Sequence, residues 1–403
     1  MKYFIMLCDG MADEDIDILD NSTPMKKAYK PCMDSLAKKS EIGLCKTVQD
    51  EMKPGSDVAN LAVLGYNAKE IYCGRSPLEA ASIGIKLKDT DVTFRANLVS
   101  LSDDKEYKNK TMLDYSGGDI STNEARELVT YIQEKLGNDE FHFYSGVSYR
   151  HCLVWDNGKC IEDLLTPPHD ISNKCVKDYL PKGIYEEKLL PLMEKSYELL
   201  KNHPVNIERI KQGKKPANSL WFWGEGTKPS LENFTEKNHV KGSMISAVDL
   251  LKGIAILSGM NSVDVENATG YIDTNFKGKA EAAINEFKSG QDLVYVHCEA
   301  PDECGHRGEA ENKIKSIEMI DELVLKPVVE FLRTYDDFKV LVCPDHPTPL
   351  CIRTHSRIPV PYMIYSSINE IDSNIDSFNE DTAKSTGNVI DPGYKIMKDF
   401  LSE

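Results

Sequence analysis

The chain has 403 residues, more than a single compact core usually holds, so we expect two domains. Its 48 basic and 65 acidic residues give a formal net charge of −17, which argues against nucleic-acid or membrane-surface partners. Its 11 cysteines include no C-x-x-C pair, and Asp9 interrupts the first apolar run too early for a secretory signal. We therefore expect a cytoplasmic protein with reduced thiols, either a monomer or a small homo-oligomer.

The first quarter of the chain alternates between strand and helix patterns. Residues 3–7 form an apolar run typical of a buried strand, and it ends at Cys8-Asp9-Gly10. A helix is expected over 32–39, after Pro31, and another over 57–64, after a Pro-Gly turn. The segment Ser76-Pro77-Leu78-Glu79 resembles a capping box, so a short helix should start there.

The middle of the chain has a different pattern, which predicts a separate α+β unit. Residues 92–98 alternate apolar and polar, as in a half-exposed strand, and Ser121 with Glu124 should cap a helix that Gly137 closes. Residues 141–155 predict one or two strands, 166–183 a loop, and 186–202 a helix despite Pro191.

After residue 219, strand and helix patterns alternate again, as in the first quarter of the chain. Strands are expected over 220–223, 293–296, 339–342 and 360–365, and helices over 243–252 (ending at Gly253), 279–288 and 314–331. We therefore predict an α/β fold with a doubly wound, mostly parallel sheet, formed by residues 1–74 and 229–403. Residues 75–228 would form a smaller inserted α+β domain.

Three of the predicted strands lead into an aspartate. Asp9 follows the first strand, Asp302 the strand near 293, and Asp345 the strand near 339. Carboxyl ends of neighbouring parallel strands meet at one edge, where α/β sheets place their sites. Three histidines come close behind these acids in the sequence: His306, His346 and His355.

These six side chains have the chemistry of a metal site. Carboxylates with imidazoles suit Mn²⁺ or Zn²⁺ better than Ca²⁺, and six ligands are about right for two ions. Ser56 lies in the Pro-Gly turn before a helix, and a metal ion could activate its hydroxyl as a nucleophile. Each fragment alone is common by chance, and His297, inside an apolar strand, is better interpreted as a hydrogen-bonded core residue.

With these residues the chain resembles the alkaline phosphatase superfamily. More closely, it is similar to the archaeal-type cofactor-independent (2,3-bisphosphoglycerate-independent) phosphoglycerate mutases. The matching segments extend to about residue 365: MLCDGMAD, KPGSDVANLAVLGY, GRSPLEAASIGI, LWFWGEG, ATGYIDTN, VYVHCEAPDECGH, CPDHPTP and RTHSRIPVP.

The resemblance implies a reaction and a ligand set. One divalent metal would be held by Asp302, His306 and His355, and the other would be held by four residues: Asp9, Ser56, Asp345 and His346. Mn²⁺ is the expected ion, with Mg²⁺, Zn²⁺ or Co²⁺ as alternatives and no 2,3-bisphosphoglycerate. Ser56 would be transiently phosphorylated while 3-phosphoglycerate becomes 2-phosphoglycerate, a step of glycolysis and gluconeogenesis. The inserted domain would close over the metal domain through two hinges.

An anionic substrate needs cations and hydrogen-bond donors to hold its carboxylate and phosphate. Arg95, Arg150 and Lys241 are the candidates, with Asn97 and His151 as further ones; solvated surface charge is the alternative interpretation of the three cations. Asp119 stands where relatives often have His or Arg, which would not favour an anion there.

Two alternative functions share the metal and serine residues. One is a homoserine kinase-like phosphotransferase of the same family, and the other is a metal-dependent phosphatase. The chain has neither a G-x-x-x-x-G-K-[ST] loop nor a G-x-G-x-x-G motif, which argues moderately against the kinase.

Overall fold

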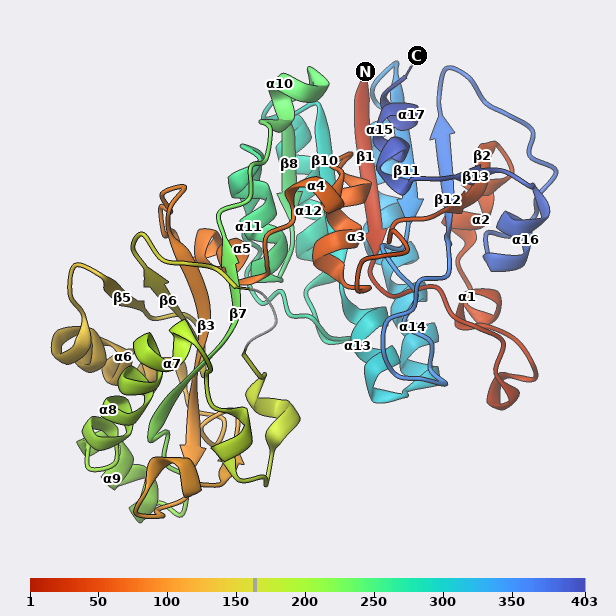
Figure 1. Cartoon of the computed structure of the whole chain (residues 1–403). Helices are drawn as coiled ribbons and strands as arrows, with labels where there is room; N and C mark the ends of the chain where they lie inside the picture. The colour runs from red at the N-terminus through yellow and green to blue at the C-terminus, as the bar shows by residue number, and fades with distance from the viewer. Residues whose placement is uncertain (162–164, 403) are drawn as a thin grey trace. The chain divides into compact units, whose positions relative to one another are not determined.

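The computed structural model describes residues 1–161 and 165–402 and divides into two compact units. Unit 1 comprises Met1–Tyr72 and Ser230–Glu403, and unit 2 comprises Cys73–Pro229 (Figure 1). Within the described ranges, no helix is both long enough and apolar enough to cross a membrane.

Unit 1 is built on an eight-stranded sheet with the order β13-β2-β12-β11-β1-β10-β8-β9. Strands β11, β1, β10, β8 and β9 run parallel, whereas β12 is antiparallel to both of its neighbours. This confirms the predicted α/β class with a mostly parallel sheet. The strand bounds are β1 Lys2–Cys8, β2 Ser40–Cys45, β8 Gly242–Ile245, β9 Asn261–Val263, β10 Leu293–Cys298, β11 Phe338–Cys343, β12 Val360–Ser366 and β13 Val389–Ile390.

Helices cover both faces of this sheet because its central strands are apolar on both sides. Phe4 and Met6 of β1 belong to one core with residues of α12, α14 and α15, while Tyr3 contacts Phe400 of α17. The unit 1 helices are α1 Pro24–Lys27, α2 Pro31–Ala37, α3 Ser56–Val63, α4 Ala68–Ile71, α10 Phe234–Asn238, α11 Asp249–Leu257, α12 Phe276–Lys288, α13 Ala300–Arg307, α14 Ala310–Ile320, α15 Lys326–Leu332, α16 Glu380–Ser385 and α17 Ile396–Leu401, with 3₁₀ turns at Asp17–Leu19 and Gly393–Lys395.

The expected helix over 243–252 is wrong at its start. Gly242–Ile245 forms β8, which pairs in parallel with β10 and β9, and α11 begins only at Asp249. The strand is too short for its period to show in the sequence. Gly253, expected to end the helix, lies inside α11. The glycine after the helix end is Gly259, whose φ of +73° is a left-handed conformation that favours glycine.

The long helix predicted over 314–331 exists, but it is not uniform. A π-helical segment, Asp321–Leu325, separates α14 from α15, and Pro327 stands in the first turn of α15. Proline has no N–H to donate, so the α-helical ladder is interrupted at this point. The buried Asp321 carboxylate accepts hydrogen bonds from the Cys32 and Met33 amides and thereby anchors α2.

Unit 2 contains an antiparallel sheet in which β3 pairs with β4, β6 and β7, and β6 pairs with β5. Its strands are β3 Val92–Leu101, β4 Met112–Asp114, β5 Phe141–Tyr144, β6 Arg150–Trp155 and β7 Ser219–Thr227. Its helices are α5 Ser76–Ser82, α6 Thr122–Leu136, α7 Ile184–Lys188, α8 Leu190–Leu200 and α9 Pro204–Lys211, with 3₁₀ turns at Tyr107–Asn109, Pro168–Ile171 and Val176–Tyr179.

Local predictions in unit 2 had mixed outcomes. The Ser121–Glu124 capping box of α6 is confirmed. Ser76, in contrast, caps nothing, because its hydroxyl bonds to the Thr93 carbonyl and hydroxyl of β3. This contact helps to explain why β3 is buried on both faces rather than half-exposed. Pro191 divides the helix expected over 186–202 into α7 and α8.

Candidate active site

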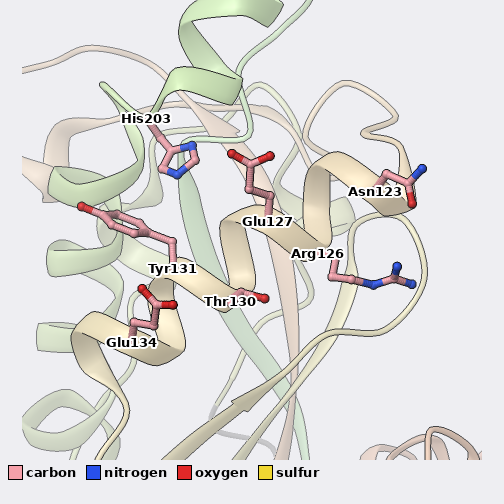
Figure 2. A pocket seen from close by; sticks show the side chains of 7 residues that line it. All are labelled: Asn123, Arg126, Glu127, Thr130, Tyr131, Glu134 and His203. Carbon is pink, nitrogen blue, oxygen red and sulfur yellow. The ribbon is translucent and has the colours of Figure 1, made fainter.

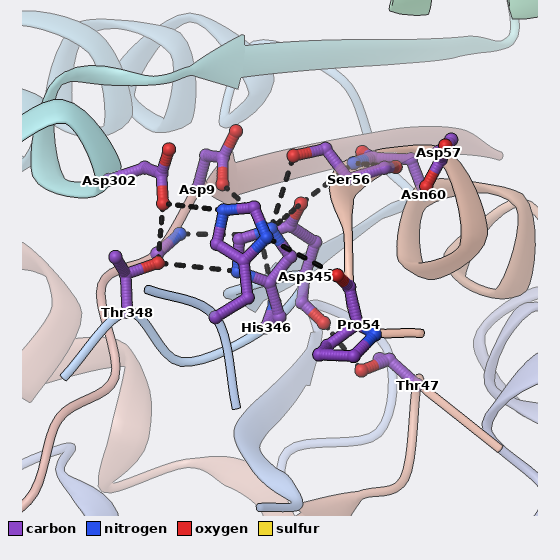
Figure 3. Close-up of polar contacts among 12 residues, drawn as sticks. Asp9, Thr47, Pro54, Ser56, Asp57, Asn60, Asp302, Asp345, His346 and Thr348 are labelled. Carbon is purple, nitrogen blue, oxygen red and sulfur yellow. Dashed lines mark hydrogen bonds and ion pairs between the residues drawn. The ribbon is translucent and has the colours of Figure 1, made fainter. Parts of the chain in front are cut away.

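The three predicted aspartates follow three adjacent strands of unit 1. Asp9 follows β1, Asp302 lies in the first turn of α13 after β10, and Asp345 follows β11. Strand β1 lies between β10 and β11, so the carboxyl ends of the three strands meet at one edge. All three carboxylates are at least nine-tenths buried, and Figure 3 shows them converging with His346.

Histidine nitrogens face these carboxylates at short range. His346 Nε2 lies 3.6 Å from Asp9 Oδ1 and 3.5 Å from Asp345 Oδ2. His306 and His355 present Nε2 to Asp302 at 3.4 and 3.5 Å. Three overlapping trios keep all their ligand atoms within 4.8 Å of one another: Asp9 with Asp345 and His346, Asp302 with His346 and His355, and Asp9 with Glu299 and Asp302.

The outer nitrogens of these histidines contact neutral acceptors. His306 Nδ1 lies 3.0 Å from the Arg353 carbonyl, and His355 Nδ1 lies 3.4 Å from the Pro54 carbonyl. A carbonyl accepts only, so each Nδ1 donates to it, and in the neutral imidazole Nε2 is left with its lone pair toward the cluster. This orientation is the one that metal-binding histidines usually adopt.

Ser56 is the first residue of α3, and its side chain reaches the same cluster. Its Oγ lies 3.1 Å from His346 Nε2 (Figure 3). Gly55, before it, has the extended backbone of the turn, so α3 starts at the serine itself. The predicted nucleophile and six predicted ligands are therefore brought together at one edge of the sheet.

The electrostatics of the cluster show a shortage of positive charge. Burial, followed by the neighbouring Asp345, Asp302 and Glu299 carboxylates, raises the pKa of Asp9 well above its usual value. The hydrogen bond with Asp302 raises the pKa of His306 to about 9. The carboxylates thus favour any added cation, whether a proton or a metal ion.

The residues present fit divalent metal ions. Asp9 Oδ1 is buried and accepts no hydrogen bond from the described residues, which is costly for a carboxylate oxygen unless a cation binds it. The mixture of carboxylate oxygens and imidazole nitrogens suits first-row divalent ions. A cation held by these residues would neutralise the repulsion that raises the pKa of Asp9.

Several supporting side chains were not predicted, because only contacts reveal them. Thr348 donates to Asp302, and Thr47 donates to the Asp345 carbonyl at 2.5 Å. His297, interpreted as a core residue, is fully buried and hydrogen-bonds Asp9 Oδ2 at 2.9 Å and Ser246 Oγ at 3.1 Å. Burial and the nearby Lys279 lower the pKa of His297 to about 3, so it is a neutral support for Asp9.

Arg95, Arg150 and Asn97 lie together in unit 2. The β3–β6 register pairs Asn97 with Arg150, so these two share a sheet face, and Arg95, two residues from Asn97, also faces that side. Arg95 pairs with Glu79 at 2.9 Å and stacks on Trp223 at 4.1 Å, so it is not a free surface charge. Arg150 is exposed.

Two predicted substrate residues do not fit this arrangement. His151 pairs with Ala96, so it faces the opposite side of the sheet; burial, then Arg150, lowers its pKa to about 3. Lys241 precedes β8, and its carbonyl accepts from the Asp292 and Leu293 amides at the start of β10. It therefore lies at the amino edge of the sheet, about 20 Å from the aspartates at the other end of the strands.

A separate pocket lies along helix α6 of unit 2 (Figure 2). It contains no predicted site residue and is lined by Asn123, Arg126, Glu127, Thr130, Tyr131, Glu134 and His203. Asp119, in the turn before α6, is exposed and accepts a hydrogen bond from Ser116 Oγ at 3.1 Å.

Comparisons with known proteins agree with this geometry. A family model described as 2,3-bisphosphoglycerate-independent phosphoglycerate mutase matches residues 37–206. A probable enzyme of that name from Geobacter sulfurreducens is 46% identical over 401 residues, covering 100% of both chains. The chain belongs to this family. The homologous mutase from Methanosarcina barkeri is 46% identical and covers 95% of both chains.

Two solved structures share the fold of this chain. A cofactor-independent phosphoglycerate mutase from Thermoplasma acidophilum is 25% identical, with a TM-score of 0.65 over 100% of this chain and 99% of that one. A protein from Pyrococcus horikoshii is 28% identical, with a TM-score of 0.81 over 100% of this chain and 98% of that one. The family prediction made from the sequence motifs is therefore confirmed.

Proposed function

We propose that this chain interconverts 3-phosphoglycerate and 2-phosphoglycerate through a phosphoserine at Ser56, without 2,3-bisphosphoglycerate. The observation that carries the proposal is the 3.1 Å approach of Ser56 Oγ to His346 Nε2, inside the cluster of aspartates and histidines. A serine at that position can exchange a phosphoryl group with a substrate bound over the same residues. The family's named activity supports the same reaction.

We assign Asp302, His306 and His355 to one divalent ion and Asp9, Ser56, Asp345 and His346 to the other. When bound, such ions lower the pKa of a coordinated hydroxyl and neutralise charge on phosphoryl oxygens. Mn²⁺ is the ion we propose, since the mixed donor set suits it. His346 belongs to two of the three trios that could hold a metal, and its 3.1 Å contact with Ser56 Oγ is the reason we assign it to the ion of Asp9 and Asp345.

The protein's own groups perform the rest of the reaction. The Ser56 oxygen forms a bond to phosphorus as the bond from phosphorus to the glycerate oxygen breaks, and the proton lost by the Ser56 hydroxyl ends on the released glycerate oxygen. The glycerate then turns, its other hydroxyl takes the phosphoryl group back, and the proton of that hydroxyl ends on Ser56. Arg95 and Arg150 are the groups we propose to hold the carboxylate and phosphate, because guanidinium groups bind both in a bidentate manner.

The test is a coupled assay on purified protein loaded with Mn²⁺, with 3-phosphoglycerate and no 2,3-bisphosphoglycerate. Homoserine with ATP, and release of inorganic phosphate from 3-phosphoglycerate, are measured in parallel. Formation of 2-phosphoglycerate with neither other activity supports the mutase. Activity with homoserine and ATP alone, or phosphate release alone, would replace it with the corresponding alternative.

The cell compartment and assembly state are also proposals. We place the enzyme in the cytoplasm, where phosphoglycerates are metabolised and where its 11 cysteines, all thiols in this structure, would stay reduced. We expect a monomer or a small homo-oligomer, acting on a small anionic substrate, with no nucleic-acid or membrane partner. Light scattering during size-exclusion chromatography gives the assembly state directly.

A further inference from the structure

A hydrogen-bonded bridge connects the nucleophile's helix to a proposed metal ligand. The Asn60 amide nitrogen donates to the Ser56 carbonyl and to Asp345 Oδ2, both at 2.8 Å (Figure 3). The Tyr295 hydroxyl lies 2.5 Å from the Asn60 carbonyl oxygen. Asn60 and Tyr295 are fully buried, so water cannot replace these bonds.

The bonding pattern permits only one orientation of the Asn60 amide. Its NH₂ group has two protons, and its two acceptors are the Ser56 carbonyl and the Asp345 carboxylate. The remaining oxygen can only accept, so the Tyr295 hydroxyl must donate to it. If the amide flipped, its oxygen would face two other acceptors with no proton between them, which is costly in a buried site.

The elements explain why these residues meet. Asn60 follows Ser56 by four residues, one turn of α3, so both side chains lie on the same face of the helix. Tyr295 lies in β10 between Val294 and Val296, which belong to the core on one side of the sheet. The alternation of the strand therefore directs Tyr295 to the other side, where Asn60 is.

We propose that Asn60 and Tyr295 are positioning residues, which fix Ser56 relative to the Asp345 carboxylate and thereby set both metal affinity and turnover. Asn60 holds Oδ2 of Asp345, while the Gly10 and His346 amides bond to Oδ1. Tyr295 acts through Asn60 by locking its amide. The effect on turnover rests on the proposed function, but the effect on metal affinity does not.

The test compares Tyr295→Phe and Asn60→Leu with a matched control, Tyr362→Phe. Tyr362 is an equally buried tyrosine of the same sheet, and its hydroxyl bonds to Glu41 instead. Removing a group that orients a metal ligand typically costs 10- to 100-fold in metal affinity or activity. We expect each test variant to bind Mn²⁺ about 10- to 100-fold more weakly by calorimetry and to lose kcat by a similar factor, with KM for 3-phosphoglycerate unchanged.

The control separates positioning from simple structural damage. Tyr362→Phe should change the melting temperature about as much as Tyr295→Phe does, but it should leave Mn²⁺ affinity and kcat near the wild-type values. The proposal is overturned if Tyr295→Phe keeps wild-type Mn²⁺ affinity, or if the control loses as much. If Asn60→Leu does not fold, Tyr295→Phe decides. A wild-type protein without mutase activity would refute the proposed function, yet the calorimetry would still judge the bridge.

Discussion

A buried ion pair connects the loops that carry the site, and we expect its removal to lower the free energy of unfolding of unit 1. Lys313 of α14 and Asp13 pair at 2.7 Å, and neither side chain is exposed. Lys313 also donates to the Thr348 carbonyl at 2.9 Å. Asp13 accepts from the Leu350 amide. The pair thus connects the segment after Asp9 to the segment after His346.

The variant Lys313→Met should destabilise unit 1 by about 3–5 kcal/mol, because it leaves a buried carboxylate without its cation. Methionine nearly preserves the volume of the lysine stem, so a cavity adds little to that figure. Lys315→Met is the matched control, since Lys315 lies two residues along the same helix and is exposed. It should change stability by at most about 0.5 kcal/mol.

The assay has to report unit 1 separately, because a two-domain chain need not unfold in one step. All three tryptophans, Trp155, Trp221 and Trp223, lie in unit 2, so their fluorescence follows that unit. Native-state hydrogen exchange of the β1 and β11 amides follows unit 1. The reasoning is refuted if Lys313→Met lowers the opening free energy of those amides by less than about 1 kcal/mol, or if Lys315→Met lowers it equally.

Three further outcomes are expected. Ser56→Ala should lower kcat by about 10⁵-fold or more while the protein stays folded, and substantial remaining mutase activity would disprove the covalent route. Arg95→Ala should lower kcat/KM by about 10- to 100-fold, which corresponds to the free energy of one charged hydrogen bond. Arg126→Ala, at an exposed arginine of the same unit, should leave kcat/KM unchanged. Because His151 has a pKa of about 3 in the fold and 6.5 when unperturbed, unfolding takes up a proton below pH 6.5. Unit 2 should therefore lose about 1.4 kcal/mol per pH unit as the pH falls from 6.5 toward 3, relative to His151→Phe, as followed by tryptophan fluorescence; equal slopes in both proteins would contradict the assignment.

The sequence was sufficient to predict the cluster because its residues occupy positions that topology alone brings together. Asp9, Asp302 and Asp345 each come just after a strand, and parallel strands bring their carboxyl ends to one edge. His355 follows no strand directly; its place in the sequence nine residues after His346 suggested it as a ligand, and the family resemblance assigned it to an ion. The four-residue strand β8 was missed because so short a segment fits a helix as well as a strand.

What the sequence could not predict is the set of contacts made across elements. Nothing in the period of β10 distinguishes Tyr295, which reaches Asn60, from an ordinary core tyrosine. The alternation of apolar and polar residues correctly predicts the two faces of β3. It does not predict that Ser76 and Glu79 of α5 cover the polar face. Patterns report the element to which a residue belongs, whereas its partner depends on how elements pack.

The net charge of this chain likewise does not predict the charge at its site, because the site depends on which residues the fold brings together. A net charge of −17 does not favour an anionic substrate, yet the chain bears Arg95 and Arg150 on one face of the unit 2 sheet. In unit 1, the buried carboxylates of Asp302 and Asp345 repel that of Asp9 and raise its pKa. Divalent cations bound to these carboxylates would make the local charge favourable for phosphate. The net charge of the surface and the local charge at the site are therefore set by different residues.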